Sequence, residues 1–285
     1  MNVKRAFADI AEGQMHYRFA GWDHDASPPL VMFHGSPGSS WALERLVGVL
    51  GETRTTLAFD TLGQGDSSRP ATDDADMAYF ADAAGRALEA LGPRFSQFDV
   101  FGTHTGARIA TELAIGGDDR VRKLILDGMS DGINPFYRQY AETLDKSHLI
   151  DQEGTQFFKT WTIVRDGHIF WPPSERNAEH LRGTGLPTAD TLHDQVMDAL
   201  KSVRAGHVAY RAAILYPSDE RLPLVKVPTL VTCATDDSPF QYFDGAAKLV
   251  PGCSKKLHPH ANPITKATDE ELGALAEMLQ AWLDG

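Results

Sequence analysis

The chain has 285 residues, of which 42% are hydrophobic and 23% are charged, a balance typical of a soluble globular protein and not of a collagen-like or disordered one. Its formal net charge of −12 argues against nucleic acid and anionic membranes as partners, because phosphate groups bind to clustered Lys and Arg. Its two cysteines are too few for a disulfide framework, and no apolar run has the length of a membrane span or the form of a secretory signal. We therefore expect a cytoplasmic protein.

The first half of the chain alternates between strands and helices. The segment FADIAEGQMHYRFAG predicts two strands joined at Glu12-Gly13, and PPLVMFHG predicts a third strand that leads into the glycine-rich loop GSPGSS. A helix over WALERLVGVL, a strand at TTLAFD and the loop TLGQGDSSRP follow. A helix with apolar residues from Met77 to Leu91 then precedes the strands FDVFG and VRKLILDG, which flank a helix over residues 105–115. This alternation predicts an α/β fold with a mostly parallel sheet.

The alternation stops at about Met129 and resumes near the segment VPTLVTCATDD. The intervening stretch is rich in aromatic residues, Gly and Pro, and its periodic pieces, such as TLHDQVMDALKSV, are helical. A last strand at CSKKLHPH and an amphipathic helix near the C-terminus complete the pattern. We therefore expect one core domain, made of residues 1–128 and 223–285, and a mainly helical cap domain made of residues 129–222.

The stretch VFGTHTGARIA, residues 100–110, predicts a strand, a sharp turn and the start of a helix. Gly102 and Gly106 flank the turn because tight packing there leaves no room for side chains. Many hydrolytic enzymes carry Ser, Cys or Asp as a nucleophile at the centre of such a turn, and this chain carries His104. The helix amides behind the turn favour developing negative charge, so an anion hole is expected whatever the side chain at its centre.

Five motifs in this order, HGSPGSS, DTLGQGDSSRP, GTHTG, ATDD and PHANP, resemble those of the α/β-hydrolase superfamily. The resemblance is to its capped branch, which includes haloalkane dehalogenases, epoxide hydrolases and C–C hydrolases. It implies an α/β-hydrolase fold without a cofactor, in which Asp237 is the triad acid and His260 the triad histidine. It also implies an oxyanion hole formed by the backbone amides of Ser36 and Thr105, with His104 in the nucleophile position.

An imidazole at this position can act in several ways. As a nucleophile, His104 would form an acyl-imidazole that water hydrolyses with His260 as the base. As an acid or base, it would move protons opposite His260 without a covalent intermediate. The helix N-terminus is expected to bias His104 towards its neutral form, because positive charge is disfavoured there. In the non-catalytic alternative, His104 only fills the site.

Neighbouring residues offer alternatives for the triad acid and base. Asp236 is an alternative acid. The resemblance favours Asp237, because the Gly-x-x-Asp pattern of the family falls on Ala234 to Asp237. His258 is an alternative base, since strand alternation places it on the same face as His260. A metal site made of His258, His260 and Asp237 has little support, because no further residue completes a tetrahedral set.

The aromatic cap predicts an apolar or aromatic small-molecule substrate. Trp41, which follows the oxyanion loop, and Trp161 and Trp171 in the cap are the candidate apolar contacts. Arg165 and His168, which lie between the two cap tryptophans, are the candidate polar contacts, and either Arg138 or Arg165 is suited to a carboxylate.

The sequence therefore predicts a cofactor-independent hydrolase of a small, largely apolar or aromatic ester, lactone or C–C bond, which uses an atypical His104-His260-Asp237 triad. Two alternatives belong to other classes: a lyase or isomerase that uses the two histidines as acid and base, and a non-catalytic small-molecule receptor. No metal, nucleic acid or membrane is expected as a partner. The protein is expected to be a monomer or a homodimer.

Overall fold

A computed structural model describes residues 2–117, 119–132, 138, 141, 150–183, 185–258 and 264–285. Its centre is an eight-stranded sheet in the order β1-β2-β4-β3-β5-β6-β7-β8. The strands span Lys4–Ile10, Gly13–Ala20, Leu30–Phe33, Thr56–Phe59, Phe98–Thr103, Val121–Asp127, Thr229–Ala234 and Ser254–His258, numbered β1 to β8 along the chain. β1 and β2 form the predicted hairpin and pair antiparallel, and all pairs from β4 to β8 are parallel. The predicted α/β class with a mostly parallel sheet is confirmed.

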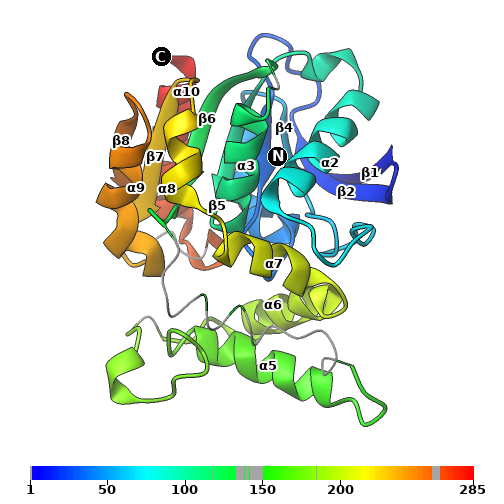
Figure 1. The fold of residues 1–285 in the computed structure, drawn as a ribbon, viewed down its shortest axis with the longest axis vertical. Coiled ribbons are helices and arrows are strands. Elements are labelled where there is room, and N and C mark those ends of the chain that lie inside the picture. The colour runs from blue at the N-terminus through cyan, green and yellow to red at the C-terminus, as the bar shows by residue number, and fades with distance from the viewer. Residues whose placement is uncertain are drawn as a thin grey trace.

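Helices cover both faces of the sheet, as the crossover connections of a parallel sheet require (Figure 1). One face packs against α2, α3 and α9, which span Met77–Ala90, Thr105–Ile115 and Phe243–Leu249. The other face packs against α1 and α10, which span Glu44–Leu50 and Asp269–Asp284. Successive side chains of the central strands point to opposite faces of the sheet. In β3, Val31 and Phe33 pack in the first helical layer, and Leu30 and Met32 pack in the second.

The connection from β6 to β7 carries three helices that lie beyond one end of the sheet: α5 (Thr155–Gly167), α6 (Ala189–Ser202) and α7 (Gly206–Ile214) (Figure 1). Polar contacts of α6 to loops that follow β3, β4 and β8 identify this end as the one where the parallel strands finish. The short helix α8 (Ser218–Arg221) returns to the core, where Arg221 pairs with Glu112 of α3. No helix in the part of the chain that the structure describes is long and apolar enough to cross a membrane.

Candidate active site

The turn between β5 and α3 has the strained backbone that its sequence predicts. His104, at the centre of the turn, has φ 50° and ψ −113°, and among the described residues it is the one non-glycine with a positive φ. A Cβ on Gly102 would lie 2.1 Å from the carbonyl oxygen of Gly106, and a Cβ on Gly106 would lie 2.1 Å from that of Phe33. Both positions therefore require glycine. The His104 amide donates to the Asp127 carbonyl oxygen at 3.0 Å, which ties the turn to β6.

The side chain of His104 pairs directly with Asp237. Its Nε2 lies 2.6 Å from Asp237 Oδ2, and the aspartate side chain is only 1% exposed. Two glycines flank the imidazole: a Cβ on Gly128 would lie 2.5 Å from its Cδ2, and a Cβ on Gly35 would lie 3.7 Å from its Nδ1. The Nε2 of the ring therefore contacts the acid, while Gly35, in the loop that follows β3, packs against Cβ, Cγ and Nδ1 of His104.

This pairing sets the charge of His104. Burial lowers the pKa of His104, but the charge and hydrogen bond of Asp237 outweigh burial, and the net pKa is raised. The nearby carboxylate of Asp127 acts in the same direction, and the Arg108 guanidinium, which donates to the His104 carbonyl oxygen at 2.7 Å, opposes it. The sequence favours a neutral ring because of the helix N-terminus. The structure instead shifts the balance towards the cation, since a carboxylate at contact distance raises the pKa of the ring.

A second histidine–aspartate pair lies beside the first. His258 Nε2, at the end of β8, is 3.0 Å from Asp127 Oδ1, at the end of β6, and both side chains are 5% exposed. Burial lowers the pKa of His258, but Asp127 outweighs it, with help from Asp237 and Asp236, and the net pKa is raised. The structure therefore places His258, the alternative base, in a buried pair.

Asp127 was not a sequence candidate, although its position carries a signal. It ends a buried strand next to the strand that leads to the turn, and the register pairs it with Thr103 on β5 and Thr232 on β7. Carboxyl ends of adjacent parallel strands meet at one edge, so an aspartate there faces the same site as His104 and Asp237.

The loop that follows β3, the predicted oxyanion loop, is held by buried polar contacts. Gln64 donates through Nε2 to Ser36 Oγ at 2.6 Å and accepts from the Gly38 amide at 3.2 Å. His34 donates through Nδ1 to the Gly35 carbonyl oxygen at 2.7 Å and accepts at Nε2 from the Thr61 amide at 3.1 Å. The structure thus brings the loop that carries Ser36 against His104, while Thr105, 3% exposed, follows His104 as the first residue of α3. His260 lies outside the described residues.

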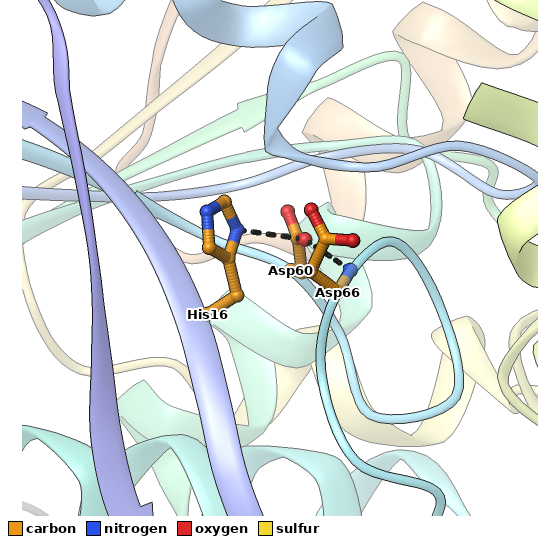
Figure 2. Close-up of side chains that lie close together, drawn as sticks. All are labelled: His16, Asp60 and Asp66. Atoms are coloured by element: carbon orange, nitrogen blue, oxygen red, sulfur yellow. Dashed lines mark hydrogen bonds and ion pairs between the residues drawn. The ribbon is translucent and has the colours of Figure 1, made fainter. Parts of the chain in front are cut away.

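Figure 2 shows His16, Asp60 and Asp66, whose possible ligand atoms lie within 4.8 Å of one another and which we considered as a metal site. Asp60 accepts hydrogen bonds from His16 Nδ1 and from the amides of Asp66 and Ser40, each at 2.8 Å. Asp66 Oδ2 pairs with Lys201 Nζ at 2.8 Å. Burial raises the pKa of Asp60, but His16 and the other donors outweigh it and lower it to about 2. Because N–H donors already occupy its oxygens, this cluster fits a loop anchor better than a metal site.

The candidate cap contacts have different environments. Trp161 on α5 is 38% exposed. Arg165 forms an ion pair at 2.7 Å with the buried Asp166, which leaves the guanidinium less suited to a substrate carboxylate. His168 Nε2 is 2.6 Å from Gln195 Oε1 of α6, and Trp41 lies in the short helix that follows Ser39. Trp171, half-buried, follows the end of α5, and its amide donates to the His180 carbonyl oxygen at 2.9 Å.

A mostly parallel eight-stranded sheet, a strained turn after β5 and an acid after β7 together describe the α/β-hydrolase fold, and the chain belongs to that family, whose sequence pattern matches residues 28–259. The predicted resemblance is confirmed at this level. The chain is 37% identical to 2-hydroxymuconate semialdehyde hydrolase of Pseudomonas sp. (strain CF600), over 43% of this chain and 48% of that protein. The alignment therefore spans about half of that relative.

Matches that cover the whole chain have lower sequence identity. The chain is 26% identical to a proline iminopeptidase of Lactobacillus helveticus (strain DPC 4571), over 97% of this chain and 98% of that protein. Among solved structures, the enol-lactonase from Burkholderia xenovorans LB400 matches with a TM-score of 0.77 and 16% identity, over 98% of this chain and 100% of that one. At that identity the match shows the fold alone.

Proposed function

We propose that this protein is a cofactor-independent hydrolase of a small, largely apolar ester, lactone or C–C bond, in which His104 acts as an acid. The observation that carries the proposal is the 2.6 Å contact between His104 Nε2 and Asp237 Oδ2. Relatives named 2-hydroxymuconate semialdehyde hydrolase and soluble epoxide hydrolase support hydrolysis of a small molecule.

A protonated imidazole has no lone pair with which to attack a carbonyl carbon. Its raised pKa instead suits it to donate a proton and to stabilise negative charge on a substrate oxygen. His104 packs against Gly35, the neighbour of Ser36, and precedes Thr105, so the acid and the predicted oxyanion amides of Ser36 and Thr105 would act on one substrate group.

The reaction would then use water as the nucleophile. His260 takes a proton from water, and the water oxygen forms the new bond to the carbonyl carbon. The amides and His104 stabilise the resulting oxyanion. When the bond to the leaving group breaks, the leaving group takes a proton from His104. The proton held by His260 then passes through solvent to His104, which restores both residues to their starting states. Asp237 orients His104 and stabilises its protonated form before the proton is donated.

The test combines rapid-quench intact-protein mass spectrometry with turnover in oxygen-18 water, using 4-nitrophenyl acetate and small aryl lactones as probes. We expect labelled product, no covalent adduct, and loss of turnover by about 10²-fold or more in His104→Ala. An adduct that is absent in the variant would contradict the acid role and make His104 a nucleophile. Unlabelled product would favour the lyase alternative. Thermal stabilisation by a probe that is recovered unchanged would favour the receptor.

The pH dependence gives a second, sharper prediction. Because the pKa of His104 is raised, its acid form persists above pH 6.5, and kcat falls as pH rises through the pKa in the folded enzyme. Asp237→Asn preserves the shape of the acceptor but removes its charge, so the alkaline limb of the kcat profile moves to lower pH. A profile unchanged in this variant would contradict the acid role.

A further inference from the structure

The cap helix α6 has a polar stripe that faces the core. Gln195, Asp198 and Lys201 are three residues apart, a spacing that places them on one side of a helix. Each contacts a different core loop, and their partners are Thr265 at 2.9 Å, Ser39, and Asp66 at 2.8 Å, respectively. Thr265 follows the segment of the predicted triad histidine, and Ser39 belongs to the predicted oxyanion loop. A single helix therefore contacts the loop that carries Ser36 and also Thr265, which stands five positions after His260 in the sequence.

The contact of Asp198 is the most buried of the three. Its residue is 9% exposed and Ser39 is 3% exposed, and Ser39 Oγ donates to Asp198 Oδ1. The same Oγ accepts from the Trp41 amide at 3.1 Å, so Ser39 also caps the short helix that follows the loop. A Cβ on Gly38 would lie 3.6 Å from Asp198 Oδ2, which places the carboxylate directly against the loop backbone.

The loop from Gly35 to Ser39 is thus held from two sides. Gln64 holds Ser36 and Gly38 from the core, at 2.6 Å and 3.2 Å. Asp198 holds Ser39 from the cap. A backbone amide stabilises an oxyanion only when it is fixed in direction before the reaction, so a loop held from one side alone is a poorer anion hole.

We propose that Asp198 is a positioning residue: from the cap it fixes the backbone of residues 35–39, so that the anion hole at Ser36 is complete only while α6 is docked on the core. This deepens the proposed function and rests on it for its catalytic consequence. The carboxylate acts as a hydrogen-bond acceptor, a role that its neutral isostere asparagine shares.

Hydrogen exchange measured by mass spectrometry tests, without any substrate, whether Asp198 holds the loop at residues 35–39; we call this contact the clamp. We expect amides in residues 35–41 to exchange about 5- to 10-fold faster in Asp198→Ala, because the variant loses the buried hydrogen bond from Ser39, and at least as fast in Ser39→Ala, which also loses the bond to the Trp41 amide. The double variant should exchange no faster than Ser39→Ala, and Asp198→Asn should stay near wild type. Lys201→Ala is the matched control from the same stripe, and its effect should be confined to the loop near Asp66.

Turnover of 4-nitrophenyl acetate tests the consequence. In Asp198→Ala we expect kcat to fall about tenfold with little change in KM, and Asp198→Asn to restore it. Unchanged exchange at 35–41 in both alanine variants would overturn the clamp. Faster exchange with an unchanged kcat would overturn the positioning role. If the wild-type protein does not turn over the ester, the proposed function has failed, and the exchange experiment still decides whether Asp198 holds the loop.

Discussion

The two sides of the candidate active site are held in place by different means. On the core side, His104 follows β5 and Asp127 ends the adjacent parallel strand β6. The His104 amide donates to the Asp127 carbonyl oxygen, and the Gly128 amide donates to the Thr232 carbonyl oxygen on β7. Main-chain hydrogen bonds therefore join the ends of these three strands. On the cap side, the polar contacts of α6 to the core are made by side chains. Strand register cannot slip without turning every side chain to the other face. Many main-chain hydrogen bonds together therefore hold the core side in place, whereas a single side-chain substitution can remove each contact between α6 and the core.

The largest effect is expected where the core side has no free space. Gly128 has φ 61°, and a Cβ there would lie 2.5 Å from His104 Cδ2 and 3.0 Å from Asp237 Oδ2. Gly128→Ala should separate this pair and lower the free energy of unfolding by roughly 2–4 kcal/mol, the sum of the left-handed backbone cost and overpacking. Urea unfolding measures the loss, and turnover should fall with it.

Gly252→Ala is the matched control for this prediction. Gly252 has φ 62° but no heavy atom within 4 Å of the added Cβ. It should therefore show the backbone cost alone, roughly 1–2 kcal/mol. Equal destabilisation in the two variants would mean that the site is not tightly packed around His104.

A smaller effect is expected from the anchor at Asp60. Its pKa is about 2 in the folded protein and 3.8 in its ordinary state, so the stability it contributes is present above pH 3.8 and is lost as pH falls through 2. The difference corresponds to about 2 kcal/mol at neutral pH. Asp60→Asn should lower the free energy of unfolding by about that amount at pH 7, and the gap to wild type should narrow between pH 4 and pH 2.

Asp76→Asn provides a comparison for the anchor. Asp76 is exposed and accepts one backbone hydrogen bond as the N-cap of α2, a role that asparagine fills equally well. Its free energy of unfolding at pH 7 should therefore match wild type. If Asp60→Asn behaves in the same way, the buried donors around Asp60 do not depend on its charge.

Sequence reasoning predicted those parts of the site that glycines and chain order specify. The strained turn at His104, and the places of the loop after β3 and of Asp237 after β7, follow from local motifs whose backbone needs are visible in the residues themselves. The direct pairing of His104 with Asp237 did not follow, because the motif describes a shorter side chain, and an imidazole reaches further. Asp127 could be recognised only from the register of β5 and β6. Asp198 could be recognised only once the position of α6 against the core was known, because no strand pattern around that helix predicts it.

The smallest effect is expected on the pKa of His104. It shows whether Asp237 alone sets this pKa or whether Asp127 contributes as much. Asp127 faces His104 without a side-chain hydrogen bond between them among the described contacts, whereas Asp237 contacts the ring. Asp127→Asn should therefore lower the pKa of His104 by less than Asp237→Asn does, as read from the imidazole resonances in an NMR titration. Asp244→Asn, which removes an exposed carboxylate paired with Lys255, should leave that pKa unchanged. A shift in Asp127→Asn as large as that in Asp237→Asn would mean that the two histidine–aspartate pairs titrate as one unit. The charge of His104 would then depend on the whole strand edge and not mainly on its contact with Asp237.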